Sequence, residues 1–371
     1  MANYDQFAAA VKEISGGKNI VLLDDLGLPS VYVPFNKIKN SELVAGLSEN
    51  VHPAFLVDGV EKPCFYYSKY QNVIINGRAY SLAHRDPNVY VPFDDAREAC
   101  EAKGAGFHLS TMAEWSAIAL WCRKNGTIPH GNNYWGRDNE HTHERGLPTS
   151  YEGSSHESHP NEPARCFTGS GPATWGHDWT QFGIQDMNGN VWEWNGGLRL
   201  KEGEIQIIPY NNAAMGAECD QSLTSTLWKA IKNDGSIVAP GTAATLKYDF
   251  VGGKIQLTTG ITSASDVGRG CQYRDMSLAS GLTAPELAKI LLIYPDEPGG
   301  DYAGDYHWMN NTGERLPLCG GGWYDGSHAG VFSVYLYDPR SVSSSNVGFR
   351  SALPSNVRSS TLMGVVPVQR G

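Results

Sequence analysis

The long tract between residues 127 and 190 constrains the fold more than any other feature of this chain. It is dominated by Gly, Pro, Asn, Ser and His, and it is far longer than the connections that usually join helices and strands. It also contains Trp135, Trp175, Trp179 and Phe182, whose side chains are too apolar to remain in water. The tract is therefore predicted to be an ordered, irregular part of a folded domain rather than a linker.

Regular elements are expected on both sides of this tract. Residues 1–85 alternate short apolar runs with turn signals, which is typical of a small strand-rich module. Two helices are predicted next, at about 94–104 and 111–126, and the second opens with a capping box formed by Thr111 and Glu114. A second irregular tract, at about 200–310, contains a few β-like runs and is interpreted as an insertion.

The charge balance argues against two classes of partner. Only 18% of the residues are charged, and the net charge of −10 opposes attraction to phosphate backbones and anionic lipid headgroups. The sequence contains no stretch of 18 apolar residues, and its N-terminus lacks the basic-then-apolar layout of a signal peptide. Neither nucleic-acid binding nor membrane insertion is expected, and the chain is expected to fold in a cytoplasm.

The motifs of the commoner enzyme classes are missing from the sequence. There is no nucleophile elbow, phosphate-binding loop, dinucleotide fingerprint or His-Glu-x-x-His zinc motif. Seven scattered cysteines without a Cys-x-x-Cys pair indicate reduced, mostly buried thiols. His141, His143, His156 and His159 could hold a transition metal, but a solvated polar loop is the favoured interpretation because no fixed element aims them.

A series of segments carries more specific information. They lie at 93–96, 109–115, 182–194, which ends in Asn-Gly-Asn-Val-Trp-Glu-Trp, 319–323, and 348–353, which opens with Gly-Phe-Arg. The series resembles the formylglycine-generating-enzyme branch of the C-type lectin fold. It resembles more closely the variable proteins diversified by diversity-generating retroelements, many of which are phage receptor-binding proteins.

The resemblance covers about residues 65–353 and implies a domain organisation. We expect an α+β chain with a C-type lectin domain at 86–353 that has long irregular loops, the insertion at about 200–310 and a variable region at about 320–353. The strand-rich module at 1–85 would precede it as an attachment module, and a tail at 354–371 would follow it.

Whether this chain shares the activity of the enzyme branch can be tested by looking for the residues that this activity requires. In that branch two cysteines on the strand after the Gly-Gly segment bind copper and perform the oxidation, and the matching positions here are Phe332 and Tyr337. Neither residue supplies a thiolate ligand. Cys319 lies before the glycine run, on a different element. The chain is therefore expected not to be an enzyme, and a divergent oxidase of the formylglycine-generating type is the disfavoured alternative.

The segment 331–338 predicts a strand with two different faces. Three alternate side chains should pack into the core: Phe332, Val334 and Leu336. Ser333, Tyr335 and Tyr337 should face solvent. Tyrosines among small polar groups are the composition that antibody paratopes use, and an ordinary half-buried strand with a tyrosine ladder is the alternative interpretation.

The resemblance also implies which residues vary. Retroelement diversification rewrites adenines, so an AAC codon can become Tyr, Asp, His, Ser, Gly or Val, but never Lys, Glu, Gln, Met or Trp. Residues 324–353 contain none of these five. Ten residues are predicted to be varied, solvent-facing ligand contacts: Tyr324, Asp325, Ser327, His328, Ser333, Tyr335, Tyr337, Asp338, Val342 and Ser344. The fixed scaffold should include Trp323, Phe332, Val334, Leu336, Gly348, Phe349 and Arg350.

A structural calcium site is the second implication of the resemblance. In the enzyme branch the segment matching 186–193 binds calcium through two side-chain and two backbone oxygens, which map to Asp186, Gly189, Val191 and Glu193. Such oxygens suit a hard cation. The alternative is that Asp186 and Glu193 cap turns or pair with a cation such as Arg350. No catalytic cofactor is expected.

Together these features predict a hypervariable ligand- and receptor-binding protein. Its expected place is a phage or prophage tail tip, where the variable face would dock on a bacterial surface protein or glycan. Virion tail proteins, or sister copies in a homo-oligomer, are further expected partners. The alternative is an adhesin or binding protein displayed on a bacterial cell surface.

Overall fold

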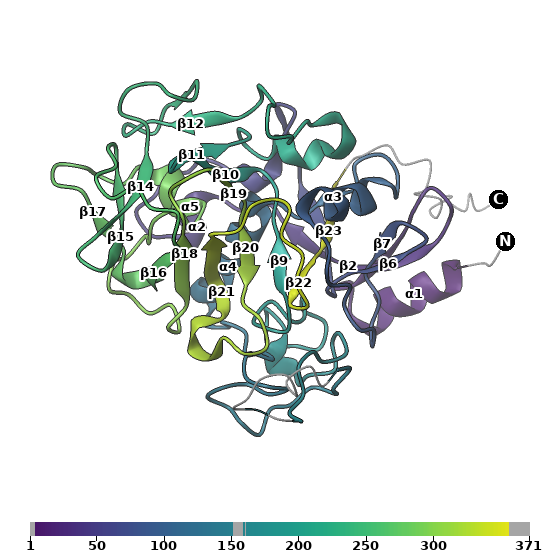
Figure 1. Cartoon of the computed structure of the whole chain (residues 1–371). Coiled ribbons are helices and arrows are strands. Elements are labelled where there is room, and N and C mark those ends of the chain that lie inside the picture. The colour runs from purple at the N-terminus through teal and green to yellow at the C-terminus, as the bar shows by residue number, and fades with distance from the viewer. Residues whose placement is uncertain (1–3, 151–158, 160, 356–371) are drawn as a thin grey trace.

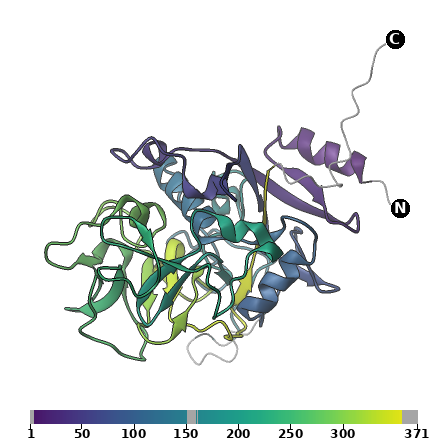
Figure 2. The same cartoon turned by 90° about the horizontal axis from the view of Figure 1, so that it is seen from above.

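The computed structural model describes residues 4–150, 159 and 161–355 (Figure 1). Almost all of the predicted tail at 354–371 lies outside these residues. The described chain is an α+β fold, as the sequence predicted. It has three main β-sheets and one long, largely buried helix. The insertion and the N-terminal helix lie at opposite ends of the molecule (Figures 1 and 2).

The first sheet joins the two ends of the chain. Its order is β1 (Ile20–Leu23), β2 (Pro29–Asn36), β5 (Cys64–Ser68), β23 (Ser351–Pro354) and β8 (His108–Leu109). β23, the last described strand, therefore lies inside the sheet, antiparallel to both β5 and β8. The strands predicted for residues 1–85 thus share a sheet with the C-terminal end of the predicted variable region.

Residues 1–85 share buried side-chain contacts with the central helix. Phe35 and Phe65 stack with ring centroids 5.2 Å apart, and they belong to the same buried cluster as Trp115 and Ile118 of the central helix. Because these aromatic side chains need the helix to exclude water, residues 1–85 and the rest of the chain have a common core. The N-terminal region is strand-rich, but its core is not separate.

The second sheet carries the candidate site. Its order is β16 (Arg269–Gln272), β18 (Tyr306–Met309), β21 (Gly330–Leu336), β20 (Leu318–Gly320), β9 (Trp192–Trp194) and β22 (Val347–Phe349). The pairs β18–β21 and β9–β22 are parallel, and the others are antiparallel. This arrangement places the motifs at 182–194, 319–323 and 348–353 on neighbouring strands.

The third sheet is built mainly by the insertion. It contains β10 (Leu198–Lys201), β11 (Glu204–Ile207), β12 (Lys229–Ile231), β13 (Ile237–Val238), β14 (Lys247–Val251), β15 (Lys254–Thr258), β17 (Ser277–Leu278) and β19 (Glu314–Arg315). The β-like runs recognised in the sequence are β11 and β15. Most of the other strands have two to four residues, too few for periodicity to reveal, so the tract is more regular than predicted.

The central helix confirms the predicted capping box. In α4 (Met112–Asn125), Thr111 Oγ1 accepts from the Glu114 amide at 3.2 Å, and a Glu114 carboxylate oxygen accepts from the Thr111 amide at 3.0 Å. Gly126 ends the helix in the left-handed conformation, with φ +66°. The other helix predicted from sequence is α3 (Phe93–Glu101).

The remaining elements are short or peripheral. They are α1 (Asp5–Ile14), α2 (Asn40–Leu43), α5 (Glu286–Ile290), the 3-10 turns η1 (Pro53–Phe55), η3 (Ala173–Trp175), η4 (Asn212–Glu218), η5 (Tyr273–Asp275) and η6 (Gly326–His328), and the hairpins β3 (Leu56–Val57) with β4 (Val60–Glu61) and β6 (Val73–Ile75) with β7 (Arg78–Tyr80). In the described part of the chain, no helix combines the length and apolar character needed to cross a membrane.

The described part of the 127–190 tract is ordered by burial, as predicted. Trp135 and Trp175 are buried. Asn190 joins distant loops, because its side-chain amide donates to Gln71 Oε1 at 2.8 Å and its side-chain oxygen accepts from the Cys166 amide at 2.8 Å. Trp179 differs from the expectation, since 42% of it is exposed.

Candidate functional site

Strand β21 has the two faces that its sequence alternation predicts. Phe332, Val334 and Leu336 are buried, and Phe332 packs against Tyr302 with ring centroids 4.9 Å apart. Tyr335 and Tyr337 lie on the opposite face and are half-buried. The predicted division between scaffold and surface is therefore confirmed for these five residues.

Ser333 departs from the predicted solvent-facing set. It is 0% exposed, its hydroxyl donates to the carbonyl of His328, and it accepts from the Tyr306 amide at 3.3 Å. The strand alternation does aim Ser333 away from the core, but the turn η6 folds over it. The prediction that Ser333 contacts a ligand from solvent is wrong for this reason.

Tyr335 lies at the centre of an aromatic cluster on the surface of the second sheet. Its ring centroid is 5.4 Å from that of Trp192, 5.5 Å from that of Trp308 and 5.6 Å from that of Tyr337. Trp308 in turn lies 4.6 Å from Tyr306. The cluster holds the tyrosine rings in fixed orientations, so little side-chain entropy remains to be lost when a ligand binds.

Sequence reasoning missed the contribution of β18 to this surface. Tyr306 and Trp308 are half-buried and alternate with the buried His307 and Met309. β18 pairs in parallel with β21, and Trp308 lies directly beside Tyr335. The alternation of aromatic and buried residues at 306–309 is the signal that could have identified this strand as part of the site.

The loop before β21 supplies the most exposed predicted contacts. Tyr324 is 46% exposed, and its hydroxyl accepts from the Asn346 side-chain amide at 2.9 Å. Burial of the phenol oxygen end raises the pKa of Tyr324 to about 12. Ser327 and His328 are exposed on η6, and the His328 ring lies 4.5 Å from Tyr306. These residues continue the aromatic surface around Tyr335.

The side chain of Asp325 accepts a hydrogen bond from within this loop. One of its carboxylate oxygens accepts from the Gly322 amide at 2.7 Å, and burial raises the pKa of Asp325 to about 6. The carboxyl group is thus committed to the loop that carries Tyr324, and Asp325 is less available to a ligand than the sequence implied.

The remaining predicted contacts lie after β21. Asp338, Val342 and Ser344 are partly exposed. Arg340 holds this segment in place through ion pairs with Asp94 at 2.8 Å and with Glu314 at 2.8 Å. We call the surface formed by Tyr306, Trp308, Tyr324, Ser327, His328, Tyr335, Tyr337, Asp338, Val342 and Ser344 the aromatic face.

No cysteine lies at the two positions that match the copper-binding pair of the enzyme branch. All seven lie in the described part of the chain, and all are free. The one nearest to the matching strand, Cys319, is buried, and its Sγ lies 3.7 Å from Met112 Sδ. Burial raises the pKa of the Cys319 thiol well above its usual value, so this group stays protonated and is a poor copper ligand.

The side-chain amide of Gln71 lies among the oxygen atoms of the segment predicted to bind calcium. Gln71 Nε2 donates toward the carbonyl oxygens of Asp186 at 3.1 Å, Gly189 at 3.4 Å and Val191 at 3.2 Å, and toward Glu193 Oε1 at 3.0 Å. The Asp186 side chain points elsewhere, since its Oδ2 accepts from the Gly169 amide at 2.7 Å.

These contacts do not fit a bound calcium ion. Four oxygens do converge, but the Gln71 amide occupies the centre of the group. Glu193 is also neutralised by Arg350, whose Nε lies 2.7 Å from Glu193 Oε2. The alternative that the sequence left open, pairing of Glu193 with Arg350, is the arrangement found.

The histidines do not gather into the metal site considered above. His159 stacks on Trp135 with centroids 4.6 Å apart, whereas His141 stacks on His130 with centroids 3.8 Å apart. His156 lies outside the described residues. Among the residues that the structure describes, no group of three or more His, Cys, Asp or Glu side chains could hold a metal ion.

Part of this chain matches a known family model. Residues 48–215 match the family model of the sulfatase-modifying factor enzyme 1-like domain, named FGE-sulfatase. This segment contains both predicted helices and the 182–194 motif. The match confirms the resemblance to the formylglycine-generating-enzyme branch and agrees with the predicted C-type lectin fold.

Particular solved structures are also similar to this chain. The Major Tropism Determinant M1 Variant is 11% identical, with 91% of this chain and 71% of that chain covered at a TM-score of 0.31. Treponema denticola variable protein 1 is 12% identical, with 91% of this chain and 99% of that chain covered at a TM-score of 0.31. No curated protein sequence matches.

Proposed function

We propose that this chain is a ligand-binding protein that presents diversified residues on a C-type lectin scaffold. Its proposed role is host recognition at a phage or prophage tail tip, with a bacterial surface protein or glycan as the ligand. The observation that carries this proposal is the aromatic face, in which exposed and half-buried rings of β18, β21 and η6 lie over a rigid sheet.

The chemistry of the aromatic face supports recognition of varied ligands. Tyr335 and Tyr337 are rigid anchors with polar tips, and Ser327 and His328 beside them are small or adaptable polar groups. Such surfaces combine large contact areas with hydrogen bonding. The lack of Lys, Glu, Gln, Met and Trp at 324–353 is what rewriting of adenines in Asn codons would produce.

The residues at the two positions that match the copper-binding cysteines support binding rather than catalysis. The positions that match the copper-binding cysteines hold a buried Phe332 and a half-buried Tyr337, and neither can donate a thiolate. The resemblance to the enzyme branch is accordingly proposed to be one of scaffold, with the reacting groups replaced by ligand contacts.

Two measurements test this function. The DNA beside the gene should contain a near-copy of the codons for residues 320–353 that differs only at adenines, next to a reverse transcriptase gene; absence of such a copy contradicts diversification. Labelled protein should bind intact bacteria of a susceptible strain, and Tyr335→Ala and Tyr337→Ala should each remove the binding. Ser236→Ala, at an exposed position between β12 and β13 of the third sheet, is the matched control.

Finding where the protein is displayed distinguishes a phage tail-tip protein from a bacterial surface adhesin. Immunogold labelling of purified virions should place the protein at the tail tip. Labelling of intact producer cells, with unlabelled virions, would instead identify a surface adhesin.

A further inference from the structure

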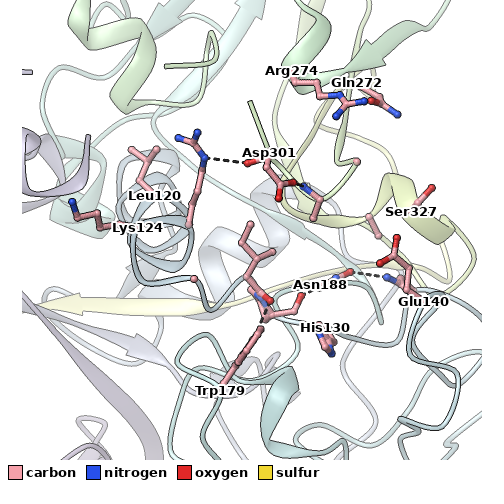
Figure 3. A pocket seen from close by; sticks show the side chains of 18 of the residues that line it. Leu120, Lys124, His130, Glu140, Trp179, Asn188, Gln272, Arg274, Asp301 and Ser327 are labelled. Atoms are coloured by element: carbon pink, nitrogen blue, oxygen red, sulfur yellow. Dashed lines mark hydrogen bonds between the residues drawn. The ribbon is translucent and has the colours of Figure 1, made fainter. Parts of the chain in front are cut away.

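A large cavity is lined in part by Ser327 of η6. Its volume is about 1230 Å³, and its walls come from α4, the loop-rich tract and the insertion (Figure 3). Figure 3 shows Lys124 from α4, His130 and Trp179 from the loop-rich tract, and Arg274 from the insertion around this space. Among the predicted variable residues, Ser327 is the one that lines the cavity within the described chain.

Trp179 gives the cavity an aromatic wall. The residue is 42% exposed, and its indole Nε1 already donates to the carbonyl oxygen of Ile128 at 3.0 Å. Its backbone has φ +53°, a left-handed conformation that is uncommon for a bulky side chain. With the N–H group already bonded, the ring offers its apolar face for stacking.

Two stacked histidines give the cavity hydrogen-bond acceptors. The rings of His130 and His141 are nearly parallel, with an interplanar angle of 8°, and His130 lies 5.6 Å from Trp179. His130 Nδ1 lies 3.0 Å from Glu144 and His141 Nδ1 lies 3.1 Å from Asp138. A carboxylate at Nδ1 holds the ring hydrogen there, which leaves Nε2 as an acceptor.

The stacked arrangement of His130 and His141 does not suit the binding of a metal ion. Because each Nε2 lone pair lies in its ring plane and the two planes are nearly parallel, the lone pairs do not converge on one point. The pair therefore suits two separate hydrogen bonds from a ligand better than one metal ion.

The charges around the cavity disfavour an anionic ligand. Arg123 is neutralised by Asp296 at 2.8 Å and by Glu297. Glu140 and Asp301 add further carboxylates to the lining, so carboxylates outnumber the cations there. This balance disfavours an anion, whereas the exposed Trp179 ring and the two histidine acceptors suit a ligand with an apolar face and hydroxyl donors.

We propose that this cavity binds a neutral oligosaccharide. One sugar ring stacks its C–H face on Trp179, and its hydroxyls donate to Nε2 of His130 and His141. The cavity volume exceeds the ~300–1,000 Å³ of typical small-molecule sites, so it has room for more than one sugar ring. The site shares Ser327 with the aromatic face, but the residues proposed to contact the sugar, Trp179, His130 and His141, lie outside the variable region.

Binding to an array of neutral hexose and N-acetylhexosamine oligosaccharides tests the proposal with the full chain. At least one neutral oligosaccharide should bind saturably, and isothermal titration should show at least tenfold weaker binding for Trp179→Ala. Tyr335→Ala is the matched control on the aromatic face and should bind the same sugar with unchanged affinity. The proposal is overturned when no neutral sugar binds or when Trp179→Ala binds as tightly as the parent protein.

Two additions keep the outcome clear. His141→Ala, in a side chain that is 42% exposed, should weaken binding several-fold at an unchanged melting temperature and so separates loss of contact from loss of folding. Sialylated and sulfated sugars on the same array should bind more weakly than neutral ones, and a preference for them would overturn the charge argument. Loss of cell binding in Tyr335→Ala with retained sugar binding distinguishes this site from the proposed receptor face.

Discussion

Glu193 and Arg350 form a fully buried, two-pronged ion pair, with Nε to Oε2 at 2.7 Å and Nη2 to Oε1 at 3.0 Å. Glu193 belongs to the Asn-Gly-Asn-Val-Trp-Glu-Trp motif, and Arg350 ends the Gly-Phe-Arg motif. Two segments that are 157 residues apart are thereby joined inside the sheet that supports the aromatic face.

Removing one partner of this pair should be strongly destabilising. Arg350→Met leaves the carboxylate of Glu193 buried without its cation, which costs about 3–5 kcal/mol. Urea unfolding measures the loss. Lys37→Met breaks the exposed pair with Glu61 and should cost less than about 1 kcal/mol. Equal losses in the two variants would contradict the buried role of Arg350.

The amide of Gln71 should make the loop around it independent of calcium. A chelator is expected to leave the melting temperature of the parent protein unchanged, because Gln71 Nε2 supplies hydrogen bonds where a cation would lie. Gln71→Ala removes those donors and should lower the melting temperature. Added calcium should then raise it in a concentration-dependent way. A chelator-sensitive parent protein, with the effect lost in Glu193→Ala, would instead establish a calcium site.

Phe332→Ala should cost about 3–5 kcal/mol in the free energy of unfolding, because this fully buried ring stacks on Tyr273 and contacts Tyr302 edge-on. Tyr337→Ala, on the opposite face of the same strand, should cost less than about 1 kcal/mol, since its ring is partly solvated. Denaturant titration of both variants compares the two faces directly, and a reversed order would show that the strand faces the other way.

Ser333 should tolerate only small residues. Its side chain is enclosed by the carbonyl of His328 and the amide of Tyr306. Ser333→Tyr would displace η6 and should cost about 1–3 kcal/mol, typical of overpacking, whereas Ser333→Gly should keep the fold. Ser327→Tyr, on exposed η6, is the control. In a population of diversified sequences, large residues at 333 should be rare, and frequent tyrosine there would refute this restriction.

His307 should make the protein less stable in mild acid. Burial lowers the pKa of His307 to about 3, whereas in the unfolded chain it is ~6.5. Below pH 6.5 the unfolded chain therefore binds one proton more than the folded chain, and stability falls by about 1.4 kcal/mol for each pH unit. Between pH 6 and pH 4, His307→Gln should show a shallower fall than the parent. His143→Gln, at an exposed position, should show the parental slope.

The elements that sequence reasoning predicted well are those whose signals are local. The capping box of Thr111 and Glu114 lies within four residues and defines the start of α4. The alternation at 332, 334 and 336 is likewise a property of one strand. Local chemistry of this kind does not depend on what the rest of the chain does.

The features that were missed depend on segments far away in the sequence. Gln71 lies 122 residues before Glu193, so nothing near the 186–193 motif indicates that an amide fills its centre. Ser333 has the alternation of a surface residue, and only the path of η6 buries it. β5 and β23 pair across most of the chain, which is why residues 1–85 resembled a separate module.

The position of β23 has a consequence if the codons that precede it are changed by diversification. Arg350 and β23 are both encoded after the predicted variable residues, yet one neutralises the buried Glu193 and the other fills the interior of the first sheet. A copying error that shifts the reading frame between residues 324 and 346 would lose both at once. Such a product would lack the cation that pairs with Glu193 and an interior strand of the first sheet, so it is expected not to fold.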